Sequence, residues 1–219
     1  IGLTSRQPAV AAPCLPAEKS MLLLGHVGIT YGAALAAEAV SLRRQQLPGH
    51  ARGLAARLRQ ANASLARRID LRLLMVGSLL PDIVDKPLWL LVLGDAYGTG
   101  RLFCHTLIFP TVLALAGATL WRARRIRALL ILAYGSGLHL VLDGMWWAPA
   151  TLFWPVTRIP LGGESSGDWL ARLLQEVFTN PAAYVPEIAG AIILLPLACL
   201  ILRGTGPVRF LRSGTVEVR

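Results

Sequence analysis

The sequence is short of charged residues, and this shortage excludes most soluble folds. Charged residues make up 16% of the 219 positions, whereas hydrophobic residues make up 54%. Soluble domains carry about 25% charged residues. Because long apolar stretches also recur along the chain, we expect an integral membrane protein.

Cysteine is scarce as well. Cys14, Cys104 and Cys199 lie far apart in the sequence and form no Cys-x-x-Cys pair. This spacing argues against a disulfide framework and against a thiolate zinc site. The sequence also lacks an internal repeat, which counts against the repeat-built transporter folds.

Basic residues, in contrast, outnumber acidic ones and give a formal net charge of +10. The arginines are concentrated in short segments between the apolar stretches, which is the pattern of the positive-inside rule. We therefore expect membrane lipids rather than nucleic acid as partners. The same rule places segments 43–72 and 122–127 and the C-terminal tail in the cytoplasm, with the N-terminus outside. The expected location is the plasma (inner) membrane.

Five apolar stretches are long enough to cross a bilayer. They cover residues 21–40, 71–93, 102–120, 128–147 and 184–202. We expect an all-α, polytopic membrane bundle of about five transmembrane helices. Residues 21–203 would form one transmembrane catalytic domain, preceded by a flexible extension (1–20) and followed by a basic tail (204–219). The oligomeric state is left open.

Two other stretches show apolar residues at helical spacing. Residues 54–69 combine an apolar stripe with arginines on the other faces. This pattern predicts a basic amphipathic helix on an anionic membrane surface, although a solvated cytoplasmic loop fits nearly as well. Residues 169–178 predict an interfacial helix or a lid. Glu38 and Glu187, near the ends of their stretches, are expected to reach toward the membrane surface.

The second apolar stretch carries an unusual polar segment. Pro81 and Pro87 bracket two acids and a lysine. Irregular backbone at membrane depth is tolerated where it faces protein or a water-filled cavity. We therefore expect the helix to be interrupted between these prolines.

Six ionisable residues lie inside the apolar stretches, where an isolated Asp costs roughly 2.5–3.5 kcal/mol on insertion scales. They are His26, Asp82, Asp85, His105, His139 and Asp143. The four-residue spacing from His139 to Asp143 places both side chains on one face of a helix. At a rise of about 1.5 Å per residue, all six fall in the outer half of the bilayer. We expect them to form one buried polar site.

Three imidazoles and three carboxylates suit one or two divalent metal ions. Mixed His/Asp ligation favours zinc, with manganese or iron as alternatives. A metal held there would activate water and polarise a scissile group, with His139, Asp143 and Arg101 as the candidate catalytic residues. Arg101 lies four residues before His105, so its guanidinium could bind a phosphate. Lys86 and Arg158 are further candidates for substrate binding, and Lys86 could instead neutralise Asp82 or Asp85.

Four motifs in this order resemble a known family. They are His26-Val-Gly-Ile-Thr30, Gly77-Ser-Leu-Leu-Pro-Asp-Ile-Val-Asp-Lys-Pro87, Gly100-Arg-Leu-Phe-Cys-His-Thr106, and His139-Leu-Val-Leu-Asp143 followed by Trp154-Pro155. Over residues 21–155 the chain resembles the YdjM-like membrane-bound metal-dependent hydrolase family. The resemblance implies hydrolysis at a metal site in the membrane.

The order of the motifs is also distantly similar to the zinc-dependent phospholipase C and single-strand nuclease superfamily. That likeness implies one zinc on Asp82 or Asp85, His105 and His139. Asp143 would then bridge to a second zinc, which His26 also binds. The superfamily has further histidines after its His-x-x-x-Asp motif and this chain has none, so a third metal is not expected.

The function expected from these observations is hydrolysis of a phosphoester in a lipid or lipid-linked substrate, reached from the outer leaflet. One alternative is a transporter or ion-binding protein that uses the same polar residues for transit. A second alternative is structural, because a single membrane histidine often serves only as a hydrogen-bonding group between helices.

Overall fold

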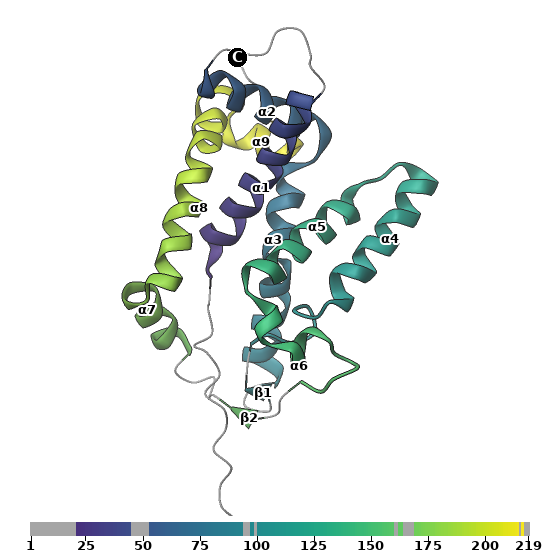
Figure 1. Cartoon of the computed structure of the whole chain (residues 1–219), viewed down its shortest axis with the longest axis vertical. Helices are drawn as coiled ribbons and strands as arrows, with labels where there is room; N and C mark the ends of the chain where they lie inside the picture. Colours follow the sequence, from purple (N-terminus) through teal and green to yellow (C-terminus); the bar gives the residue numbers. More distant parts are fainter. Residues whose placement is uncertain are drawn as a thin grey trace, which may run out of the picture.

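The computed structural model describes residues 21–44, 53–93, 97–98, 100–159, 162–163, 169–214 and 216. These residues are almost entirely helical (Figure 1). The helices are α1 (Leu23–Arg44), α2 (Leu54–Arg68), α3 (Leu71–Leu88), α4 (Ile108–Arg124), α5 (Ala128–Leu142), α6 (Pro149–Leu152), α7 (Trp169–Thr179), α8 (Pro181–Leu200) and α9 (Pro207–Ser213). Strands β1 (Tyr97–Gly98) and β2 (Gly162–Gly163) form a two-residue parallel pair. The expected extension over residues 1–20 lies outside the described residues.

Two helices are long and apolar enough to span a membrane. They are Leu23–Arg44 and Pro181–Thr205, the latter being α8 with a π-helical turn. Helix α5 is apolar but has only 15 residues. Helix α3 carries Asp82, Asp85 and Lys86 within its apolar stretch. The five spans expected from the sequence are therefore not confirmed by length and composition, although each apolar stretch does contain a helix.

Glycines allow two pairs of helices to approach closely. A Cβ atom on Gly28 of α1 would lie 2.3 Å from the carbonyl oxygen of Gly190 in α8. A Cβ atom on Gly135 of α5 would lie 2.6 Å from the backbone nitrogen of Ser78 in α3. Both distances are far shorter than van der Waals contact, so the α1–α8 and α3–α5 pairs pack backbone against backbone. Such packing of small residues is typical of helices in membranes.

The expected interruption between Pro81 and Pro87 is wrong. Helix α3 continues through both prolines to Leu88, and a π-helical turn follows at Trp89–Leu93. Pro81 has no N–H to donate to the carbonyl oxygen of Gly77, four residues earlier. Ser136 of α5 replaces the missing donor, because its hydroxyl donates to that carbonyl oxygen at 3.0 Å.

Helix α2 packs on protein, in contrast to the membrane-surface helix expected there. Ala61 and Leu65 are buried, and Leu65 belongs to the core that also contains Tyr31 of α1. The Ser64 hydroxyl donates to Glu38 Oε1 at 2.5 Å, and Arg68 Nε lies 3.1 Å from the same oxygen. Amphipathic spacing alone does not distinguish a helix that covers a protein core from one that covers lipid.

Glu38 is buried and Glu187 is half-buried, and both accept hydrogen bonds from protein groups, so the expectation that they reach toward the membrane surface is wrong. Glu38 is held by α2. Glu187 of α8 accepts hydrogen bonds from the backbone N–H groups of Leu22, Leu24 and Gly25, at 2.8–3.0 Å. A carboxylate in this position satisfies N–H groups that have no partner within α1 and complements the helix dipole.

The basic segments gather at one end of the molecule. Helices α2 and α9 lie together at the top of Figure 1, and the α4–α5 connection also points to the upper half. The region 204–219 was expected as a basic tail, but its residues 204–214 fold back onto this end. Phe210 of α9 is buried in the core, and the Gly214 carbonyl oxygen accepts a hydrogen bond from Leu71 N at 3.3 Å.

Candidate metal centre

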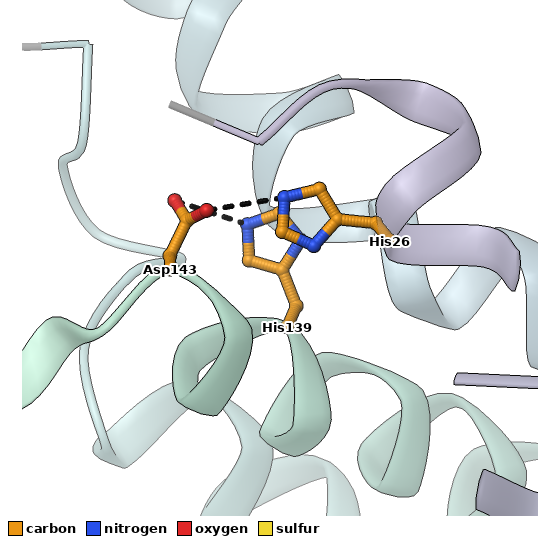
Figure 2. A group of neighbouring side chains, drawn as sticks. All are labelled: His26, His139 and Asp143. Atoms are coloured by element: carbon orange, nitrogen blue, oxygen red, sulfur yellow. Dashed lines mark ion pairs between the residues drawn. The ribbon is translucent and has the colours of Figure 1, made fainter. Parts of the chain in front are cut away.

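The predicted polar residues meet toward the other end of the bundle. His26 lies in the first turn of α1, Asp82 in the second half of α3, and His105 in the segment before α4. His139 lies in the last turn of α5, and Asp143 is the residue that caps this helix. Figure 2 shows His26 stacked over His139, with Asp143 beside both rings. The three histidines are completely buried.

The tautomer of His139 is fixed by a backbone carbonyl group. Its Nδ1 atom lies 2.7 Å from the carbonyl oxygen of Ser78 on α3. A carbonyl oxygen only accepts hydrogen bonds, so Nδ1 carries the hydrogen of the neutral ring. The Nε2 atom is therefore left with a lone pair that can bind a metal. The close α3–α5 packing makes this contact possible.

His105 is oriented in the same way, by Asp85. His105 Nδ1 lies 2.8 Å from Asp85 Oδ2. The Asp85 carboxylate also accepts hydrogen bonds from the backbone N–H groups of Leu102, Cys104 and His105, at 2.9–3.1 Å. Asp85 was predicted as a metal ligand, but the structure places it behind His105. It holds the ring and the loop from which the ring projects, as carboxylates behind metal-binding histidines do.

Four residues, called the cluster below, bring electron-pair donors close to one another: Asp82, His105, His139 and Asp143. His105 Nε2 and His139 Nε2 are 3.2 Å apart. Asp82 Oδ1 lies 3.5 and 3.9 Å from these nitrogens, and Asp143 Oδ2 lies 3.7 and 3.8 Å from them. The ligand atoms of a tetrahedral zinc site are separated by about 3.3–3.6 Å, given Zn–N and Zn–O bonds of about 2.0–2.2 Å.

The chemistry of these donors calls for a cation. With both Nδ1 atoms protonated, the two facing Nε2 atoms carry lone pairs that repel each other. Two carboxylates add negative charge to the same space. Asp82, His105 and His139 offer donor atoms close enough to share one divalent ion, with Asp143 beside them, so the residues present fit a metal ion.

His26 adds a further donor at the edge of the cluster. Its ring stacks on His139 with centroids 4.0 Å apart, and its Nε2 atom lies 3.1 Å from Asp143 Oδ1. The two atoms are close enough for an ion pair, but neither has a hydrogen-bond partner of acceptable geometry among the described residues. His26 Nδ1 and the Thr30 hydroxyl, one helical turn further along α1, are likewise buried without one. His26, His139 and Asp143 thus form a second group that could hold an ion.

Two cations neutralise the carboxylates of the cluster. Lys86 Nζ lies 2.7 Å from Asp82 Oδ2, and Arg101 Nε lies 3.1 Å from Asp143 Oδ2. These residues also form the accessible edge of the cluster, since the Asp82 side chain is 15% exposed and that of Arg101 is 13% exposed. Arg158, the third predicted substrate-binding residue, is exposed and forms no ion pair with the cluster in the described part of the chain.

Sequence reasoning missed the residues that support the histidines. The Ser78 carbonyl oxygen orients His139, and Ser136 restores the bond that Pro81 removes. The signal was the pair of small residues in each helix, Gly77-Ser78 and Gly135-Ser136, because small residues mark close helix crossings in membranes.

Comparison with curated proteins and with solved structures finds no match. A family model, that of the YdjM inner membrane protein, matches residues 21–208. The match spans most of the chain and includes every residue of the cluster. The chain therefore belongs to the YdjM inner membrane protein family.

Proposed function

We propose that this protein is a membrane-embedded, metal-dependent hydrolase that cleaves a phosphoester of a lipid or lipid-linked substrate. The observation that carries the proposal is the pair of imidazole Nε2 atoms, 3.2 Å apart, whose Nδ1 atoms face acceptors. Both lone pairs point into a space that two carboxylates share. A helix-packing role would not require two unprotonated nitrogens to face each other.

Asp82, His105, His139 and Asp143 would hold the metal, with His26 available to a second ion. Zinc is the best match to this donor set, and manganese or iron are the alternatives. When bound, such an ion supplies Lewis acidity and activates a water molecule for attack on a phosphoryl group.

The protein's own residues would bind and orient the substrate. Lys86 and Arg101 border the two ligand carboxylates at the accessible edge of the cluster. An anionic phosphate that approached this edge would therefore meet two positive charges, and a guanidinium group suits a phosphate well. Arg158 would contribute only through a longer-range attraction. Glu164 and Asp168, in the connection between α6 and α7, would be candidates for a general acid, and both lie outside the described residues.

The membrane placement that goes with this proposal is multi-pass. The two apolar helices α1 and α8 would span the bilayer, and α3, α4 and α5 would complete a five-span bundle with the help of protein contacts to their polar residues. The basic end would face the cytoplasm under the positive-inside rule. The cluster, at the other end of the helices, would then open toward the outer leaflet.

Phospholipid turnover tests the proposal. Purified protein in detergent, loaded with zinc or manganese, is mixed with phospholipids, and the release of phosphorylated headgroup and of diacylglycerol is followed. We expect turnover that a chelator abolishes and that Asp143→Asn lowers by roughly 100-fold or more, with Asp70→Asn as a control outside the cluster. Flux of substrate across reconstituted vesicles without any product would instead support the transporter.

A further inference from the structure

An apolar groove opens near the basic end of the molecule, away from the metal-binding cluster. Its volume is about 460 Å³. Ala34 and Ala37 of α1, Leu74 of α3, and Ile131 and Tyr134 of α5 line it, together with residues from the ends of α2 and α4. Ala37 lies eleven residues beyond His26 on α1, roughly 16 Å along the helix axis. The groove is therefore a separate feature of the fold.

Arginines lie beside this groove, where α4 ends and α5 begins. Arg122 and Arg124 in the last turn of α4, and Arg125 and Arg127 in the α4–α5 connection, are all exposed, and Arg127 lines the groove itself. The Arg125 guanidinium lies 5.9 Å from the ring centroid of Trp121, which also lines the groove. Within the described residues, none of the four arginines forms an ion pair with a carboxylate. In the part of the chain that the structure describes, no carboxylate therefore pairs with the positive charge beside the groove.

The acid in the groove wall does not cancel this charge. Glu38 lines the groove, but its carboxylate is buried against α2. Arg68 Nε lies 3.1 Å from Glu38 Oε1, and the Ser64 hydroxyl donates to the same oxygen. The remaining charge beside the groove is therefore that of the arginines.

We infer that this groove binds an anionic phospholipid of the leaflet that faces the basic end. An acyl chain would lie along the apolar wall, and the phosphate would bind the arginines beside the groove. Basic pockets between membrane helices on the cytoplasmic side bind anionic headgroups in this way. The inference concerns a site distinct from the metal-binding cluster and does not depend on hydrolysis.

Two other occupants fit the charges less well. A zwitterionic lipid brings a cationic group along with its phosphate and leaves the arginines poorly compensated. In a two-fold dimer, a second copy of this chain would cover the groove with the same surface. Four more arginines would then face the first four and repel them. The chemistry beside the groove therefore favours an anionic lipid.

The test is lipid binding by the full chain, purified in detergent and measured by native mass spectrometry. The two probes are phosphatidylglycerol and phosphatidylcholine with the same acyl chains. Two variants change the site: Arg125→Gln with Arg127→Gln removes charge beside the groove, and Ala37→Leu fills the groove. Each has a matched control. Arg59→Gln with Arg67→Gln makes the same charge change on exposed residues of α2, and Ala36→Leu alters an exposed neighbour of Ala37 that does not line the groove.

We expect wild-type protein to prefer phosphatidylglycerol. Loss of the two arginines should weaken phosphatidylglycerol binding by roughly 10- to 30-fold, at about 1 kcal/mol for each arginine, and leave phosphatidylcholine nearly unchanged. Ala37→Leu should weaken both lipids by roughly fivefold or more. The two controls should bind both lipids as wild type does.

Equal affinity of wild type for the two lipids would overturn the inference. It would also be overturned if either test variant matched its control, or if the lipid-free protein were a dimer that Ala37→Leu dissociates. His139→Ala should keep the lipid preference intact, so a failure of the proposed metal chemistry is distinguishable from a failure of this site.

Discussion

The direction in which each imidazole points decides what the cluster can bind. His139 and His105 both donate from Nδ1, to a carbonyl oxygen and to a carboxylate respectively. Their Nε2 atoms are then acceptors that face each other. A histidine with the opposite tautomer would present an N–H to the same space and repel a metal. The residues behind the rings therefore matter as much as the ligands themselves.

Asp85 gives the first test at this scale. Because it orients His105 rather than contacting the metal position, Asp85→Asn should weaken zinc affinity by about 10- to 100-fold without abolishing binding. Zinc affinity is measured by competition with a chromophoric chelator. His105→Ala, which removes a direct ligand, should lose most of the binding.

Asp82→Asn is the informative comparison, since Asp82 lies one helical turn before Asp85 and offers Oδ1 to both imidazoles. We expect a larger loss of zinc affinity for Asp82→Asn than for Asp85→Asn. The reverse order would show that Asp85 is the ligand and that its position behind His105 is misassigned.

The crossing of α3 and α5 is the element that brings the histidines and their partners together. Gly77 and Gly135 let the two backbones touch, and this places the Ser78 carbonyl oxygen within reach of His139. A larger residue at either glycine would push the helices apart. The geometry of the cluster therefore depends on the packing of two glycines, although neither glycine has a side chain that could bind a ligand.

Gly135→Ala tests this coupling. Its Cβ would lie 2.6 Å from Ser78 N, so the helices must separate, and overpacking of this kind costs about 1–3 kcal/mol. We expect a lower melting temperature and reduced zinc affinity. Gly137→Ala is the control two residues away, because its Cβ would meet only Pro110 Cβ, at 4.0 Å. Equal behaviour of the two variants would count against a role for the crossing in shaping the site.

The start of α3 gives a prediction about pH. Asp70 caps this helix by accepting a hydrogen bond from Arg72 N at 2.9 Å, and its side chain also pairs with the Arg72 guanidinium. The hydrogen bond from the Arg72 side chain lowers the pKa of Asp70 below its ordinary value. The unfolded chain therefore takes up a proton at a higher pH than the folded chain does. The interaction of Asp70 with Arg72 contributes fully to folding stability above the pKa of Asp70 in the unfolded chain. This contribution is lost as the pH falls through the pKa of Asp70 in the folded chain.

Melting temperatures of wild type and Asp70→Asn, measured in detergent from pH 7 to pH 2, check this expectation. The variant should be less stable at pH 7, and the difference should shrink below about pH 4, where Asp70 is protonated in the unfolded chain. Because both side chains are partly exposed, added salt should reduce the effect. A stability difference that stays constant over this range would contradict the account.

On the scale of the whole molecule, the basic end and the candidate metal-binding cluster lie toward opposite ends of the helices. Figure 1 shows α2 and α9 at one end, and the turns that follow α5 at the other. This separation gives each end a distinct role in the proposed topology. In that topology the basic end would meet the cytoplasm and anionic lipid, and the cluster would meet the substrate.

Labelling with a membrane-impermeant maleimide tests this orientation in intact cells. Cys14 and Cys199 are first replaced by serine, and one new cysteine is introduced at Arg59 of α2 or at Val156 beyond α6. Val156 is 91% exposed and Arg59 is also exposed. We expect Val156→Cys to react in intact cells and Arg59→Cys to react only after permeabilisation. The opposite pattern would invert the proposed topology.

The convergence of polar residues was predictable from the sequence, but their individual roles were not. Depth along each apolar stretch was enough to predict that His26, His105, His139 and Asp143 share one level. Asp82 and Asp85 lie three residues apart on one helix, so periodicity places both near the same face. The path of the loop that carries His105 decides which of the two pairs with His105 Nδ1, and in the folded chain it is Asp85.

The errors at the level of elements have similar causes. The apolar stripe of α2 is the same whether it meets lipid or α1, and only the contacts to Tyr31 and Glu38 separate the two. Pro81 indicated a broken helix because its sequence neighbours cannot replace the missing hydrogen bond. The replacement comes from Ser136, which lies 55 positions later and becomes a neighbour only in the folded bundle.

Metal content is the most direct measure of the central claim. Plasma mass spectrometry is applied to purified wild type, His139→Ala and Asp143→Ala, with Asp70→Asn as a carboxylate control outside the cluster. The account predicts one to two equivalents of zinc or manganese in wild type and in the control, and loss of metal in both cluster variants. Wild-type protein that holds no metal, even after reconstitution with zinc or manganese, would contradict it.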